Sequence, residues 1–299
     1  MARKELTLKD KNLLHNYLTL KEHELSVYAF ENIYIWKALF KVTWDIIEDN
    51  LCIFFQDKIG MFLYLPPLGK SLSRRAVDEA FRLMDKENKN KEVSRIENIE
   101  DADLRFFKDL GFICKDKFPE YLCRRVDLAG LKGNRFKPKR ASFNYFIKNY
   151  SGKYLPFGIQ DARTCLGLYQ SWMQERNSAY QDPVYQGMLA DNLGCLKLLL
   201  RDYRKLNFIG RVVKISGVVK GFTFGFRLDK DTLCIIYEVT DLSIKGLAQF
   251  IFREFCRELK EYSYINIMDD SGLENLRRVK KSFRPQRLIP SFIASRDNR

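Results

Sequence analysis

The chain has 299 residues, of which 46% are hydrophobic, 14% aromatic and 30% charged, a balance that excludes wholesale disorder and fits one large globular domain or two of ordinary size. No apolar run reaches the roughly 20 residues of a membrane-spanning helix and the N-terminus lacks the apolar core of a secretory signal, so we expect a cytoplasmic protein. The net charge of +14 predicts a polyanionic partner.

The first half of the chain alternates helical and strand patterns. Helical spacing of apolar residues predicts two opening helices, and alternating apolar residues then predict successive strands. Ser71 or Ser73 is expected to cap an amphipathic helix, and Gly111 to end a short one. The expected elements are helices at 6–20 and 26–40, strands within 43–69, a helix at 71–90, a strand at 93–99, a helix at 101–112 and strands within 112–128.

The second half repeats this order after a basic segment in which Pro138 can start a helix. The expected elements are a strand at 154–160, helices at 162–177 and 186–206, three strands within 208–241, a helix from Gly246, a strand at 262–268, a helix at 272–283 and a strand at 287–295. The shared order predicts a duplicated α/β unit. We therefore expect an N-terminal domain at 1–130, a basic linker helix at 131–150 and a C-terminal domain at 151–299.

The positive charge is concentrated in two segments. Residues 124–153 hold nine Lys or Arg and one Asp, and residues 271–299 hold eight Lys or Arg and two acidic residues, so together they carry the whole net charge of +14. We expect the two segments to bind an anion such as tRNA or a phospholipid headgroup. The oligomeric state stays open.

Cysteine and histidine are too scattered for a metal centre. The seven cysteines include no CxxC pair, and the only histidines are His15 and His23. We expect no metal site, and reduced, mostly buried thiols.

Several stretches resemble known families. The stretch FFKDLGF at 106–112 resembles a late helix of GNAT acyltransferases, and residues 242–248 resemble a reduced form of their phosphate-binding loop, with Lys245 and Gly246 retained. Over nearly the whole chain, five ordered blocks are similar to the phosphatidylglycerol lysyltransferase C-terminal-domain family: 24–37, 64–69, 127–150, 235–255 and 275–292. This resemblance implies an α/β fold that is a tandem duplication of a GNAT-like unit, shared with the Fem peptidoglycan ligases.

The resemblance also implies a reaction. Membrane-bound lysyltransferases and Fem ligases use aminoacyl-tRNA as donor, so the implied function is aminoacyl transfer to an amine or hydroxyl acceptor, with no certain cofactor. Two alternatives stay open. One is an N-acyltransferase that uses acyl-CoA, which the reduced phosphate loop makes the weaker choice. The other is a non-catalytic protein that binds RNA or anionic lipid on an enzyme scaffold.

Candidate site residues lie mainly in the second half. Aminoacyl transfer needs a positioned acceptor, a proton acceptor and a stabilised oxyanion. Carboxylates near strand ends are the candidate catalytic groups: Glu238, Asp241 and Asp269. Glu238 comes first, because burial in its apolar strand would raise its pKa. Basic and helix-start residues are the candidate phosphate or substrate ligands: Arg135, Lys137, Lys139, Arg140, Lys245, Gly246, Arg277, Lys280, Lys281 and Arg284.

Overall fold

The computed structural model describes residues 3–297 and divides the chain into two compact units. Unit 1 comprises the chain up to Glu120 together with the segment from Ile289 onward, and unit 2 comprises Tyr121–Leu288. The chain passes from one unit to the other within strand β6 (Ile113–Arg124) and returns within strand β12 (Arg287–Ser295). The segment 131–150, expected to be a linker, therefore lies inside unit 2.

Unit 1 contains the strand order β1-β2-β3-β4-β5-β12. Its remaining strands are β1 (Lys4–Glu5), β2 (Lys41–Ile47), β3 (Asn50–Gln56), β4 (Met61–Leu63) and β5 (Arg95–Ile99). Neighbouring strands pair antiparallel except β4 and β5, which are parallel. Aromatic side chains from β3 and from the residue after β4 stack in its core, with the rings of Phe55 and Tyr64 centred 3.9 Å apart.

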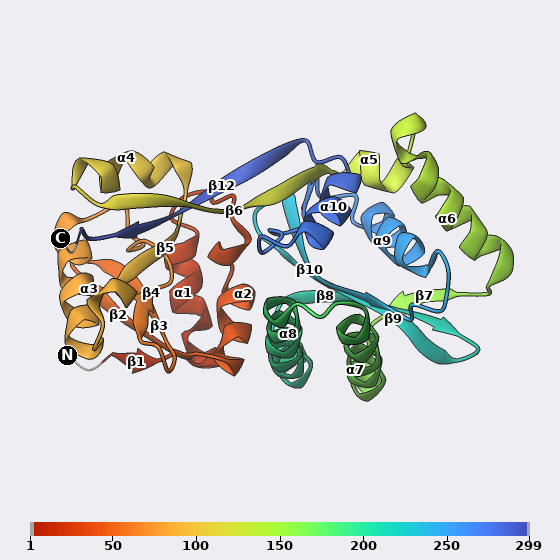
Figure 1. Cartoon of the computed structure of the whole chain (residues 1–299), viewed down its shortest axis with the longest axis horizontal. Helices are drawn as coiled ribbons and strands as arrows, with labels where there is room; N and C mark the ends of the chain where they lie inside the picture. The colour runs from red at the N-terminus through yellow and green to blue at the C-terminus, as the bar shows by residue number, and fades with distance from the viewer. Residues whose placement is uncertain (1–2, 298–299) are drawn as a thin grey trace. The chain divides into compact units, whose positions relative to one another are not determined.

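The helices of unit 1 follow the expected order (Figure 1). They are α1 (Lys11–Leu18), α2 (Phe30–Ile35), α3 (Arg74–Glu87) and α4 (Asp101–Asp109). Ser73 caps α3, since its hydroxyl accepts a hydrogen bond from the Ala76 amide at 3.2 Å. After α4, Gly111 has a φ of +82°, the left-handed conformation that commonly ends a helix and that glycine adopts without strain.

Unit 2 contains the strand order β6-β11-β10-β9-β8-β7. Its strands besides β6 are β7 (Lys153–Pro156), β8 (Phe208–Ile215), β9 (Val218–Arg227), β10 (Thr232–Thr240) and β11 (Tyr264–Asn266). All neighbouring pairs are antiparallel except β10 and β11, which pair in parallel. The β9–β10 register shifts between Ile235 and Tyr237, as at a β-bulge, which re-aims the residues that follow.

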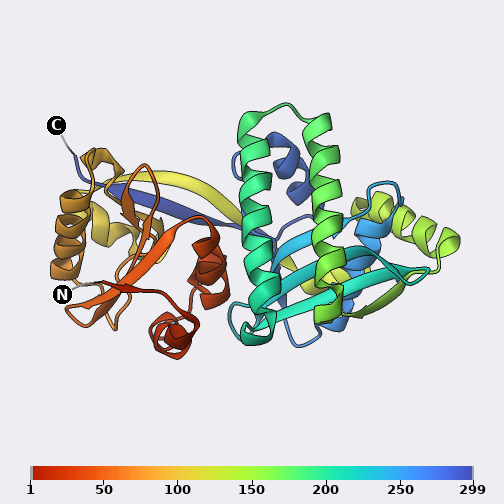
Figure 2. The same cartoon turned by 90° about the horizontal axis from the view of Figure 1, so that it is seen from below.

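Helices cover both faces of the unit 2 sheet. They are α5 (Arg125–Gly130), α6 (Lys137–Asn149), α7 (Ala162–Ala179), α8 (Pro183–Asp202), α9 (Leu247–Glu258) and α10 (Glu274–Ser282). The antiparallel pair α7 and α8 lies on one face (Figure 2), and α9, with α6 packed on it, lies on the other (Figure 1). Within residues 3–297, no helix combines the length and the apolar character needed to cross a bilayer.

The sequence of β9 explains how the two helical layers fit this sheet. Residues Phe222, Phe224 and Phe226 alternate with smaller ones, and adjacent strand residues point to opposite faces. The three phenylalanines are fully buried. On the other face, a Cβ added at Gly225 would lie 3.2 Å from the ring of Phe255 in α9. Small residues on that face therefore let α9 approach the strand closely.

Candidate functional site

The candidate site lies where β10 and β11 stop pairing. The parallel register covers only Thr232–Cys234 of β10 against Tyr264–Asn266 of β11. Beyond it, β10 continues to Thr240 while β11 has ended. On that edge, the side chains of the last part of β10 therefore have no neighbouring strand beside them. Helix α9 packs against β10, and α6 packs on α9 (Figure 1).

Glu238 is the carboxylate on this free part of β10. It pairs in register with Thr223 of β9 and is partly buried. Desolvation raises its pKa to about 8, although the positive charges of Lys139 and Lys280 act in the opposite direction. A carboxyl group that titrates near neutral pH can both accept and return a proton during a reaction.

Lys139 of α6 and the C-terminal end of α10 meet beside this carboxylate. The Lys139 ammonium lies 3.4 Å from the ring centre of Phe283. Burial lowers the pKa of Lys139 to about 8, against the attraction of Glu238, which raises it. The Lys280 ammonium donates a hydrogen bond to the carbonyl of Ile267, just after β11. The two basic segments of the sequence therefore contribute to one site.

Gly246 is the N-cap residue just before α9 and has a clear packing role. Its φ is +87°, and a Cβ at this position would lie 2.1 Å from the carbonyl oxygen of Ser142 in α6. The amide of Leu247 donates to the carbonyl of Ile244 at 3.3 Å. Lys245 is exposed, and its ammonium lies 4.7 Å from the ring centre of Tyr145. Because α6 lies directly against the start of α9, the glycine is required here without any bound phosphate.

The other two predicted carboxylates stabilise turns. Asp241 forms an ion pair with Lys220 at 2.9 Å and accepts hydrogen bonds from the Ser243 amide and hydroxyl. Burial raises the pKa of Asp241, but these hydrogen bonds and the lysine outweigh it, so the pKa is lowered overall. Asp269 accepts from the amide of Ser271 at 2.7 Å. Asp241 therefore lacks the raised pKa that marks Glu238.

A buried carboxylate that the sequence reasoning missed lies next to Asp269. Asp270 is 1% exposed, accepts a hydrogen bond from the Tyr121 hydroxyl at 2.5 Å and pairs with Arg277 at 3.0 Å. It thereby ties β6 and α10 to the turn after β11. The sequence alone does not reveal which of two adjacent aspartates faces inward.

The remaining predicted cations divide into two groups. Some hold the protein together: Arg140 donates to the carbonyls of Leu131 and Gly133, and Arg135 pairs with Asp127 at 2.9 Å. Others are exposed on α6 and around the end of α10: Lys137, Lys281 and Arg284. The second group is available to an external anion.

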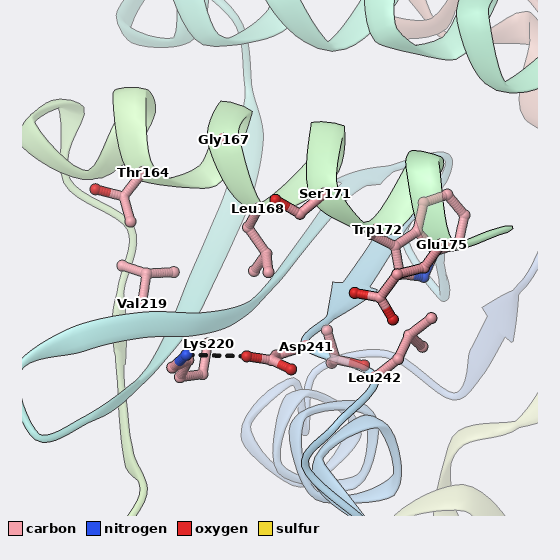
Figure 3. A pocket seen from close by; sticks show the side chains of 11 residues that line it. Thr164, Gly167, Leu168, Ser171, Trp172, Glu175, Val219, Lys220, Asp241 and Leu242 are labelled. Carbon is pink, nitrogen blue, oxygen red and sulfur yellow. Dashed lines mark hydrogen bonds and ion pairs between the residues drawn. The ribbon is translucent and has the colours of Figure 1, made fainter. Parts of the chain in front are cut away.

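A small pocket lies on the other face of the sheet, under α7 (Figure 3). It has a volume of about 300 Å³ and is bounded by α7 and by the ends of β9 and β10. Among its lining residues are Trp172 and Glu175 of α7, with Lys220 and Asp241 opposite. Sequence analysis did not identify it, although residues 164, 167, 168, 171, 172 and 175 recur at the spacing of one helix face.

Known proteins share this architecture. A structure of a conserved protein of unknown function from Bacteroides thetaiotaomicron has 24% identity and a TM-score of 0.87, covering 99% of this chain and 100% of that one. The structure of L-PGS from Bacillus licheniformis has 16% identity and a TM-score of 0.67, covering 100% and 95%. FemX has 10% identity and a TM-score of 0.62, covering 100% and 98%.

A tandem GNAT protein from the clavulanic acid biosynthesis pathway has 8% identity and a TM-score of 0.52, covering 98% of each chain. These likenesses confirm the expected α/β fold with tandem GNAT-like architecture. No curated protein matches the sequence. The family model described as "Phosphatidylglycerol lysyltransferase, C-terminal" matches residues 19–295. The five sequence blocks fall within this match, and the chain belongs to the family of the phosphatidylglycerol lysyltransferase C-terminal domain.

Proposed function

We propose that this protein is an aminoacyltransferase that moves an aminoacyl group from aminoacyl-tRNA to an amine or hydroxyl acceptor, with Glu238 as the proton acceptor. The observation that carries the proposal is the electrostatic interaction of Glu238 with Lys139, which lies beside it in α6. Both groups are partly buried, both have a pKa of about 8, and each attracts the other's charged form. A carboxyl group that titrates near neutral pH suits acyl transfer, in which one proton must leave the nucleophile and one must reach the leaving group.

The reaction balances with these groups. The acceptor nitrogen or oxygen attacks the carbonyl carbon of the aminoacyl ester, and its proton passes to the Glu238 carboxylate. The resulting tetrahedral intermediate collapses when the bond to the ribose oxygen of the tRNA breaks. That oxygen takes the proton from Glu238, and the free carboxylate is regenerated. The positive charge of Lys139 favours the ionised form of Glu238 between turnovers.

The basic surface of unit 2 supports a tRNA donor. The exposed cations on α6 and around the end of α10 flank the site, and the Lys139–Phe283 contact joins the two elements. Cations interleaved with aromatic rings suit single-stranded nucleic acid, such as an aminoacylated tRNA end. The alternative acyl-CoA donor would need a pyrophosphate cradle at the start of α9, but α6 already packs there against Gly246.

The test is transfer of a radiolabelled amino acid from a mixed pool of aminoacyl-tRNAs to hydroxylamine, a small nucleophile that reacts with activated esters. We expect Glu238→Gln to lower the enzyme-dependent rate by about 10²- to 10⁴-fold, the usual effect of losing a general base. Glu258→Gln is the matched control, because Glu258 pairs with Arg211 and Tyr154 away from the site. Equal rates for wild type and Glu238→Gln would refute the role of Glu238. Transfer from acetyl-CoA alone would refute the tRNA donor, and no transfer from either donor would favour a binding protein.

A further inference from the structure

The pocket under α7 has a net negative character. Asp241 is neutralised by Lys220 at 2.9 Å, so this pair contributes little net charge. Glu175 is different: within residues 3–297 the structure gives its carboxylate no hydrogen bond and no ion pair. Figure 3 shows that this carboxylate projects from α7 toward Leu242, beside the indole of Trp172. The nearby Arg176 guanidinium lies 5.5 Å from the Trp172 ring centre but does not line the pocket.

A carboxylate beside an indole favours a cationic ligand. The carboxylate supplies a charge partner for an ammonium group, and the indole face attracts cations through its quadrupole. An anionic group such as a phospholipid phosphate would instead meet Glu175 with like charge. The volume of about 300 Å³ is at the small end of ligand pockets, so the ligand is the size of an amino acid or a short diamine.

The pocket is also placed along the strand that carries the candidate proton acceptor. Thr240 and Asp241 line it, and they follow Glu238 by two and three residues. At about 3.3 Å per strand residue, they lie roughly 7–10 Å further along the chain. The pocket and Glu238 lie on opposite faces of the sheet, so a ligand held here could reach Glu238 only around the edge of β10 that β11 leaves unpaired, with a group several atoms away from its ammonium.

We propose that this pocket binds the acceptor substrate, and that the acceptor is a small cation with a primary ammonium group held by Glu175 and Trp172. Its reacting amine or hydroxyl is a second group, several atoms away. The assignment of the ligand as acceptor rests on the proposed aminoacyl transfer, whereas binding of the cation does not. The class comprises diamines, amino alcohols and basic amino acids, and it excludes an anionic lipid headgroup.

The direct test is calorimetric titration of the 299-residue protein with 1,5-diaminopentane, and with glycerol 1-phosphate as the anionic probe. In NMR spectra, the indole N–H signal of Trp172, assigned through Trp172→Phe, reports on the pocket. We expect the diamine to bind and to shift this signal, and the glycerol phosphate to do neither. Glu175→Gln should weaken diamine binding about three- to fivefold, the size expected for one exposed ion pair.

Filling the pocket provides an independent variant. Gly167, in the second turn of α7, lines the pocket, and nothing lies within 4 Å of a Cβ added there, so Gly167→Leu adds a bulky side chain to the pocket wall without a clash at its Cβ. Gly187→Leu is the matched control, because Gly187 lies in the second turn of α8, has equally open surroundings and does not line the pocket. We expect Gly167→Leu to abolish diamine binding and Gly187→Leu to leave it unchanged.

The outcomes separate this inference from the proposed function. Undiminished diamine binding by Gly167→Leu, no binding by the wild type at 50 mM diamine, or tighter binding of glycerol 1-phosphate would each overturn the inference. None of those results would bear on the transfer assay with hydroxylamine, which tests the proposed enzyme activity separately. Conversely, diamine binding that Gly167→Leu abolishes, in a protein without transfer activity, would support the pocket as a cation site and refute the proposed transfer.

Discussion

Replacing Glu238 by Gln should stabilise the protein, and the gain should grow with pH. Burial raises the pKa of this carboxyl from an ordinary 4.5 to about 8. A raised pKa in the folded state means that the neutral form is favoured there. The wild type therefore loses stability as the pH rises from 4.5 through 8, because the unfolded chain ionises first. Gln cannot ionise and does not incur this loss.

The magnitude follows from the two pKa values. At 1.36 kcal/mol per pKa unit, the wild type loses about 3 kcal/mol of unfolding free energy between pH 5 and pH 8 relative to Glu238→Gln. The attraction between Lys139 and the ionised carboxylate is already contained in the pKa of about 8, so it does not add to this difference.

Urea unfolding of both proteins at pH 5 and pH 8 measures this difference. Any loss or gain of hydrogen bonding by Gln is common to both pH values and cancels in the comparison. Glu258→Gln is again the control, because the hydrogen bond from Arg211 and the weaker effect of the one from Tyr154 lower the pKa of Glu258. The ionised Glu258 therefore stabilises the fold fully above pH 4.5. The effect of Glu258→Gln on the free energy of unfolding should thus be nearly constant from pH 5 to 8. An equally constant effect for Glu238→Gln would refute the raised pKa.

Three further predictions concern the surroundings of the site. Lys139→Gln should move the Glu238 pKa above 8, because it removes an attractive charge; ¹³C NMR titration of the carboxyl carbon measures the shift, and an unchanged midpoint would show that the two groups do not interact. Gly246→Ala should cost about 3 kcal/mol in urea unfolding, since a left-handed φ and the Ser142 carbonyl both oppose a Cβ. Gly217→Ala, with a φ of +82° and open surroundings, should cost only about 1–2 kcal/mol, and equal costs would exclude the close contact. Affinity for tRNA should fall with salt, and Lys281→Gln should reduce the log–log slope by about 0.7–0.9; no change relative to Lys260→Gln, at an exposed lysine outside the two basic segments, would remove Lys281 from the tRNA surface.

The fold was largely predictable because its signals are local or distributed along the whole chain. Apolar periodicity located most helices and strands, and Ser73 and Gly111 marked helix ends by their backbone chemistry. The return of β12 to unit 1 was not predictable, because strand pairing between residues nearly 200 positions apart leaves no local pattern. The unit boundary inside β6 was not predictable for the same reason, because the local strand pattern does not show that one strand belongs to two units.

The site was predictable only in part. An isolated acid in an apolar strand pointed to Glu238, and charge counting pointed to the basic segments. The remaining features depend on tertiary contacts. The backbone of α6 leaves no room for a side chain at Gly246, and Asp270 rather than Asp269 is buried. The raised and lowered pKa values of Glu238 and Lys139 depend on burial that only the packed structure reveals.

The pH dependence of single-turnover transfer from aminoacyl-tRNA to hydroxylamine tests the proposed role of Glu238 most directly. Hydroxylamine is already neutral across the range from pH 6.5 to pH 9, so its own ionisation does not shape the profile. If Glu238 must be ionised to accept the proton, the logarithm of the rate should rise with a slope near one and level off near pH 8, the pKa of this carboxyl. A profile that is flat over this range, or one that keeps its bend in Glu238→Gln, would contradict the assignment.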